Sequence, residues 1–227
     1  MENQLSVEQL IYIYEKFGEN AQDAVEFIKK NKAPEADVIK QSSEVSAKFK
    51  SGYEAILRDG VYIVYRDGGY EEFDGDNIKE NVSFIGIAFD GHTFGVPLDH
   101  DYGKQRLLKE DNYPLDEHCL SEADALLNWD FVGETEYLKQ LGLAFELKEG
   151  HYLTTTPVFL AEYAFKEELN KALKYLGAKE INFRAYRWFA QRYDVDGAWA
   201  FNGTNGYLSD DNVNHAHQVG AVTLWNP

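Results

Sequence analysis

Two histidines near the C-terminus, His215 and His217, have the spacing that most directly suggests chemistry. Residues two apart on a strand share one face, and Asp210 and Asp211 lie a few positions upstream. Imidazole nitrogens combined with a carboxylate oxygen are zinc ligands, and the same residue types carry acid–base catalysis in small hydrolases. The alternative is an exposed polar surface, which we favour because no recognised motif surrounds these histidines.

Other chemical motifs are weak. The chain has one cysteine, Cys119, which can form neither an internal disulfide nor a cysteine–histidine zinc set. Asp99-His100-Asp101 resembles a metal cluster, but loops commonly collect such residues. The sequence therefore predicts a protein that is not an enzyme, with no catalytic residues, no metal and no cofactor.

The stretch 187–217 has an unusual composition. Large apolar residues such as Trp188, Trp199 and Phe201 alternate with residues drawn only from Asn, Asp, Gly, Ala, Ser, Tyr, His and Arg. Each of these types can be reached from an Asn codon by replacing adenines alone, as adenine-directed mutagenesis would do. Ordinary turn preferences explain these residue types at 203–206. They do not explain why the same residue types continue along the predicted strands, where Asn, Asp and Gly are usually depleted.

We predict that these interspersed residues are exposed, clustered and in contact with a ligand. They are Arg187, Asp194, Asp196, Gly197, Ala200, Asn202, Asn205, Tyr207, Ser209, Asp210, Asp211, Asn212, Asn214, His215 and His217.

Composition narrows the class of partner. The chain has 227 residues and a formal net charge of −17, which disfavours phosphate backbones and anionic lipid, so nucleic acid is not an expected partner. No apolar run approaches ~18 residues, so membrane insertion is not expected. Because Met1–Gln9 is polar and acidic, we expect synthesis in the cytoplasm without a signal peptide.

The elements that must position these residues fall into three segments. Amphipathic patterns over 6–17 and 21–32 predict a helical hairpin in 1–34. Residues 35–79 are predicted to form a linker followed by a β-hairpin around Asp67-Gly68-Gly69. Residues 80–227 are predicted to form the main domain.

Within the main domain, strands are expected at 82–89 and 93–98, and residues 100–118 are expected to be a loop. The chain then shows helical patterns, followed by a last strand. The predicted helices cover 121–129, 134–141 and 157–176, and the last strand covers 219–225. This order indicates an α+β fold, with the long helix packed on a sheet that includes the last strand.

The C-terminal motifs resemble those of C-type-lectin-fold variable proteins, the targets of diversity-generating retroelements in phages and gut bacteria. The residues are Trp188-Phe189-Ala190-Gln191-Arg192-Tyr193, Ala198-Trp199, Phe201, Gly203, Gly206 and Val219-Gly220-Ala221-Val222. Upstream, Gly150–Thr154, the helix to Leu176 and Ile85–Phe89 are similar to a related bacterial lectin-like family. The resemblance spans about 80–227 and excludes the N-terminal hairpin.

The resemblance implies a C-type lectin-like scaffold whose constant aromatic residues are buried, while variable side chains bind a protein or glycan. It implies binding without a metal, with Tyr207, Arg187 and the two histidines as energetic hot spots. A phage receptor-binding or host-surface recognition component fits this description, and such a component would be associated with the virion. The disulfides and calcium motifs of sugar-binding animal lectins are missing, so the resemblance does not extend to calcium-dependent sugar binding.

Two alternatives stay open. One is a metal-dependent lectin or small hydrolase that uses His215, His217 and Asp210. The other is a structural module that assembles an oligomer or a larger particle through residues 1–34.

Overall fold

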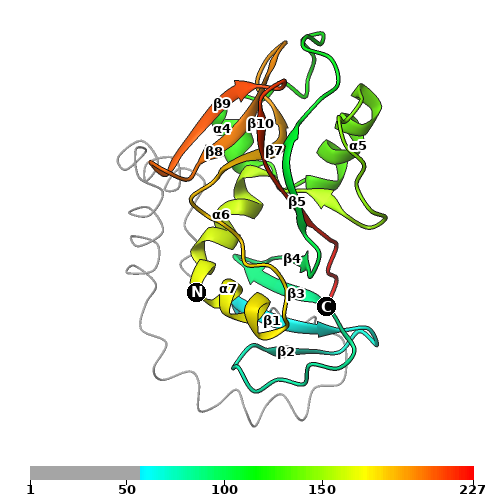
Figure 1. The fold of residues 1–227 in the computed structure, drawn as a ribbon, viewed down its shortest axis with the longest axis vertical. Coiled ribbons are helices and arrows are strands. Elements are labelled where there is room, and N and C mark those ends of the chain that lie inside the picture. The colour runs from blue at the N-terminus through cyan, green and yellow to red at the C-terminus, as the bar shows by residue number, and fades with distance from the viewer. Residues whose placement is uncertain (1–56) are drawn as a thin grey trace. The chain divides into compact units, whose positions relative to one another are not determined.

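The computed structural model describes residues 57–227, and Arg58–Pro227 form one compact unit. The predicted helical hairpin and the linker up to residue 56 lie outside the described residues. Strands come first in this unit, then mostly helices, then strands again (Figure 1). The predicted α+β class is therefore confirmed.

The first sheet has four antiparallel strands in the order β2-β1-β3-β4. They are β1 (Gly60–Tyr65), β2 (Tyr70–Glu72), β3 (Val82–Phe89) and β4 (His92–Pro97). Both predicted hairpins are present. The predicted boundary between residues 79 and 80 is wrong, because β1 pairs with β3 along its length, starting at Gly60 opposite Ala88.

The second sheet is built around the last strand. Its strands are β5 (Asp101–Arg106), β6 (Tyr152–Leu153), β7 (Tyr186–Arg192), β8 (Gly197–Asn202), β9 (Tyr207–Asn212) and β10 (Ala216–Val222). The order is β5-β10-β7-β8-β9, and β6 also pairs with β10. The loop expected over 100–118 is wrong for β5, whose polar residues pair through their backbone with β10.

The two sheets are joined just beyond β10. Gly95 of β4 and Thr223 exchange two backbone hydrogen bonds of 2.8 Å. Further along, the Trp225 ring packs closely on Gly86 of β3, where any side chain would obstruct it, and on Tyr62 of β1. The segment that follows β10 therefore ties the second sheet to the first.

Four helices complete the unit: α4 (Glu122–Leu127), α5 (Phe131–Leu141), α6 (Thr156–Ala164) and α7 (Lys166–Tyr175). The Ser121 side chain caps α4, and Gly142 ends α5 with a φ of 112°. The single helix predicted over 157–176 is interrupted at Phe165. Its N–H is shared between the carbonyls of Ala161 and Glu162.

Helix α6 lies between the sheets. It packs on the second sheet through Phe159, whose ring is 4.8 Å from the Phe201 ring and 5.4 Å from the Phe189 ring. It also contacts β3 of the first sheet, and α7 contacts both β1 and β3 (Figure 1). The predicted packing of this helical region on the sheet containing the last strand is confirmed.

The opposite face of the second sheet is covered by the segment that carries α5 and its flanking loops. Side chains of the central strands, including Trp188, Ala200 and Val219, pack there against Leu107 and Leu138. The four scaffold residues predicted to be buried are buried, namely Trp188, Trp199, Phe201 and Val222. Because the central strands are covered on both faces, polar side chains gather on β9 and at the strand ends.

Candidate binding surface on the second sheet

The register of β8 and β9 decides which predicted contact residues share a face. Asn202 lies opposite Tyr207, and Ala200 lies opposite Ser209. Directly opposed residues point to the same side of a sheet, so these four share one face. Ala198 and Asp211 are the next opposed pair on that face.

His217, at the start of β10, and His215, in the turn just before it, extend this face. The His217 ring lies 4.6 Å from the Trp188 ring and 4.3 Å from the Tyr186 ring. Both histidines also contact the carboxylate of Asp211. We call the polar part of this surface the β9 face. Its members are Asn202, Tyr207, Ser209, Asp211, His215 and His217.

Three predicted contact residues are buried, and the expectation that they are exposed is wrong. Ala200 and Gly197 lie on β8 in the middle of the sheet, where neighbouring strands and packed side chains exclude solvent. Arg187 of β7 points to the α6 side, with its guanidinium 5.4 Å from the Phe159 ring. These three residues form the scaffold and cannot contact a ligand on the surface.

Asp210 and Asn212 lie on the other face of β9, because they alternate with Ser209 and Asp211. Asp210 is opposite Trp199 on β8. The expectation of one continuous surface is therefore wrong for the full set. The histidines are paired with Asp211 and not with Asp210.

Two predicted contact residues hold the turn between β7 and β8. The Asp194 carboxylate accepts the N–H of Gly197 at 2.8 Å. The Asp196 carboxylate accepts from the Asn212 side chain at 2.9 Å and so joins this turn to β9. Turn geometry alone accounts for acidic residues at both positions.

Two further predicted residues lie in turns that flank β9. The Asn205 side chain accepts the Tyr207 N–H at 3.2 Å, just before the strand. Just after the strand, the Asn214 N–H donates to the Asn212 side chain at 3.1 Å. Asparagine is common in such turns, so these positions have a structural role whatever else they contact.

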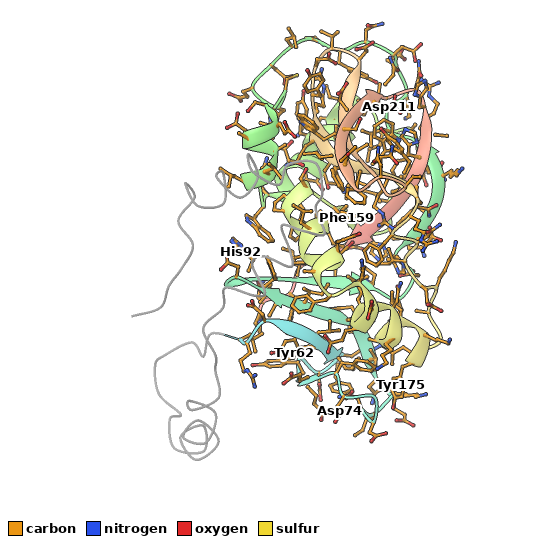
Figure 2. All side chains as sticks on the ribbon, turned by 90° about the vertical axis from the view of Figure 1, so that its left-hand side faces the viewer. Tyr62, Asp74, His92, Phe159, Tyr175 and Asp211 are labelled. Atoms are coloured by element: carbon orange, nitrogen blue, oxygen red, sulfur yellow. The ribbon has the colours of Figure 1, made fainter. Side chains whose placement is uncertain are left out.

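Asp211, His215 and His217 form the densest polar cluster on the β9 face. Nδ1 of His215 is 2.7 Å from Oδ1 of Asp211, and Nε2 of His217 is 2.6 Å from Oδ2. The Asn212 N–H also donates to Oδ1 at 2.8 Å. Asp211 lies toward the end of the described unit away from Tyr62 of the first sheet (Figure 2).

Burial and hydrogen bonding oppose each other in this cluster. Partial burial raises the pKa of Asp211, but the hydrogen bonds from His217, Asn212 and His215 outweigh it and hold the pKa below its ordinary value. Burial beside the aromatic rings lowers the pKa of His217, although Asp211 acts in the opposite direction. The cluster therefore presents a carboxylate to two imidazoles on a half-buried surface.

A second polar cluster, which the sequence did not indicate, fastens the covering segment to β7. The buried Arg192 guanidinium donates to the Tyr137 hydroxyl at 2.8 Å and to the Asp194 carbonyl at 2.8 Å. Asp116 accepts from the same guanidinium at 3.3 Å. Burial and the hydrogen bond to Asp116 raise the pKa of Tyr137 to about 12. Only the pairing of distant segments brings these residues together.

The third cluster is internal, between α6 and the second sheet. Glu162 and Arg187 are both buried, and burial raises the pKa of Glu162 to about 7 in spite of the guanidinium. His100 is also buried, and burial together with the Arg187 charge lowers its pKa to about 4. Oε2 of Glu162 and Nε of Arg187 have no hydrogen-bond partner among the described residues.

Comparison with protein-family models, curated proteins and solved structures finds no match to this chain. Within residues 57–227, none of the helices is both long enough and apolar enough to cross a membrane.

Proposed function

We propose that the protein binds a ligand through the β9 face. The observation that carries the proposal is the register of β8 and β9, which brings Tyr207, Ser209 and Asp211 to one side of the sheet. Beside them on the same side lie Trp188 and Ala200, both buried. Polar side chains thus border an apolar layer that fixes the backbone, and exposed substitutions usually alter stability by less than ~0.5 kcal/mol.

Tyr207 is the main anchor of this proposed contact. Its side chain is large and the residue is 39% exposed; Tyr70 and Tyr193 are similarly exposed, and the other aromatic residues in the described part of the chain are buried or half-buried. Tyrosine gives a large contact area with little loss of conformational freedom, and it is enriched among binding hot spots. Asn202 and Ser209 beside it add polar side chains, of which the Asn202 oxygen accepts the Thr204 N–H at 3.1 Å and the Ser209 hydroxyl donates to the Asp210 carbonyl at 3.0 Å.

We propose further that the scaffold is C-type lectin-like and that its surface has been varied by a diversity-generating retroelement. Two features support this. The last strand returns to pair with early elements, β5 and β6. The six residues of the β9 face, which exclude the buried Arg187, Gly197 and Ala200, also belong to the restricted set of residue types. The proposed ligand is a protein or glycan on a host surface, as for a phage receptor-binding component.

Binding rather than catalysis is proposed, because catalytic groups must stay within about 0.5 Å of a productive geometry. Residues of the β9 face that change from copy to copy could not keep such a geometry. Diversified side chains can still bind through shape and hydrogen bonding, with each new set of contacts selecting a different ligand.

The flanking DNA tests the diversification. We expect a near-copy of the codons for about 186–225, with Asn codons at the varied positions, and a reverse transcriptase gene nearby. Because the codons of buried Arg187, Gly197 and Ala200 are part of this segment, the repeat should show whether they too are targets. A locus without such a repeat would leave the β9 face as an ordinary invariant surface and contradict this part of the proposal.

Binding itself can be measured with labelled full-length protein on immobilised glycans and on intact gut bacteria. Replacing both Asn202 and Tyr207 with Ala should weaken binding by at least tenfold, because one change removes the anchor and the other a neighbouring hydrogen-bonding group. The matched control is Asp210→Ala, on the same strand but on its other face, which should leave binding unchanged. Equal losses in the two variants would show that the β9 face is not the contact surface.

A further inference from the structure

We propose that Asp211, His215 and His217 form a binding site for a divalent transition metal, with Zn²⁺ as the reference ion. The side chains come from the end of β9, the following turn and the start of β10. The proposal goes beyond ligand binding by the β9 face and does not depend on it, because the metal alone is the ligand. If a retroelement varies these positions, the site is a property of the copy described by this sequence.

The geometry of the three side chains points to one shared ion. One ligand atom from each residue lies within 4.8 Å of the other two. Zinc bonds of about 2.0–2.2 Å to nitrogen and oxygen require ligand atoms roughly 3–3.5 Å apart in a tetrahedral site. His215 can adjust by a small rotation, since its side chain is 59% exposed.

The donor set selects the class of metal. Two imidazole nitrogens and one carboxylate oxygen suit Zn²⁺, Ni²⁺, Cu²⁺ or Fe²⁺. Calcium and magnesium take oxygen ligands almost alone, so they are poor candidates. Three protein ligands also leave coordination positions for water or for an outside group, on the side where His215 meets solvent.

The surroundings hold two of the three ligands in place before any ion arrives. His217 packs against the rings of Tyr186 and Trp188, and the Trp188 indole N–H donates to the Gln105 carbonyl at 3.1 Å. The backbone N–H that follows Asp211 fixes one oxygen of its carboxylate. Such outer contacts typically change metal affinity by about 10–100-fold when removed.

The competing interpretation is a hydrogen-bonded His–Asp–His cluster with no affinity for metal. In that arrangement a proton lies between each imidazole nitrogen and the carboxylate. A metal ion would take the place of these two hydrogen bonds and connect the same three side chains, while each neutral imidazole keeps its proton on the ring nitrogen that does not face the metal. The sequence alone favoured the metal-free surface, and the two interpretations differ in a direct titration.

The experiment uses the full chain, freed of any histidine tag and of bound metal by a chelator. Zn²⁺ is titrated by calorimetry, and Co²⁺ is titrated by visible absorption. We expect one equivalent of metal per chain and an absorption spectrum typical of cobalt bound to nitrogen and oxygen.

Asp211→Asn and His215→Gln should each weaken Zn²⁺ binding by at least tenfold, and the double variant should abolish the stoichiometric site. Both side chains reach the surface, so folding, checked by thermal melting without metal, should be preserved. The matched controls are Asp210→Asn, on the opposite face, and His92→Gln, on β4 of the first sheet. Both should bind as the unmodified protein does.

Three results would overturn the proposal. They are no stoichiometric binding by the unmodified chain, equal affinity in Asp211→Asn, or a loss in His92→Gln as large as that in His215→Gln. None of these results would contradict the proposed binding of a protein or glycan, because that binding is measured without added metal.

Discussion

Gly220 of β10 leaves the space that the Arg187 guanidinium occupies, because a Cβ atom at position 220 would overlap Nη1 of Arg187. Arg187 is buried, and its guanidinium also lies over the Phe159 ring of α6. Strands β10 and β7, which carry the two residues, are parallel neighbours in the second sheet. A glycine in one strand thus accommodates a long cation from the next.

We predict that Gly220→Ala lowers the free energy of unfolding by about 1–3 kcal/mol, the usual cost of overpacking a core. Gly60→Ala is the control. A Cβ there meets its nearest neighbour, Tyr62, at an ordinary 3.7 Å, so the change should stay within about 0.5 kcal/mol. Urea unfolding followed by tryptophan fluorescence measures both variants, and similar losses in the two would contradict the steric explanation.

A second prediction concerns pH. The pKa of Glu162 is about 7 in the folded chain against a reference value of 4.5. Stability associated with the neutral carboxyl is fully present below pH 4.5 and is lost as the pH rises through about 7. Because Gln stays neutral, Glu162→Gln should remove this dependence, which amounts to about 3 kcal/mol for a shift of this size.

The measurement is the free energy of unfolding of both proteins at several pH values from mildly acidic to neutral. His100 acts in the opposite direction, because its lowered pKa makes the folded chain less stable as the pH falls below 6.5. Both proteins contain His100, so subtracting one free energy of unfolding from the other cancels its contribution. The exposed Glu167→Gln on α7 serves as the control and should run parallel to the unmodified protein. A flat difference curve for Glu162→Gln would show that the pKa of its carboxyl is not raised by folding.

A third prediction separates scaffold from surface on neighbouring strands. Trp199 is buried and donates its indole N–H to the Leu120 carbonyl at 3.0 Å. Trp199→Ala should cost about 3–5 kcal/mol. Tyr207→Ala, on the β9 face, should cost less than about 1 kcal/mol and should act on binding alone. Thermal melting of both variants is sufficient, and a large loss from Tyr207→Ala would place that residue in the core.

The fourth prediction tests the Arg192 hydrogen bonds that hold the segment around α5 against β7. Arg192→Lys keeps the charge but cannot reach Tyr137, Asp116 and the Asp194 carbonyl together, so it should destabilise the chain by about 3 kcal/mol. The matched control is Arg106→Lys, because Arg106 forms an exposed ion pair at 2.8 Å. Exposed pairs are worth at most about 1 kcal/mol. Equal effects in urea unfolding would mean that burial of Arg192 contributes nothing.

Local signals predicted the local structure well. The Ser121 cap, the stop at Gly142 and the hairpin turn at 67–69 each depend on a few adjacent residues, and each forms where the sequence indicated. The long helix was right in position, but its interruption at Phe165 was not signalled. Strand β5 was missed because its polar residues and Gly103 have low strand propensity, and its pairing comes from β10.

The candidate surface was predicted only in part, since burial depends on pairing between distant strands. Arg187 was expected outside, and nothing near it in the sequence indicates that Gly220 makes room for it. The choice of Asp211 over Asp210 could have been made from the sequence. Counting outward from the turn at 203–206 pairs Asn202 with Tyr207. Because every second residue of a strand points to the same face, Asp211 then lies on the face of Tyr207.

Strand β10 pairs with β5, β6 and β7, and the residues just after it close onto β4. During synthesis, therefore, β4, β5, β6 and β7 cannot complete their strand pairing until this segment has left the ribosome. Contacts this distant along the chain make folding slow, and they leave unpaired strand edges exposed in the meantime. The unit should consequently fold only after release of residues up to Trp225, and a chaperone present during synthesis should raise its yield more than one added afterwards.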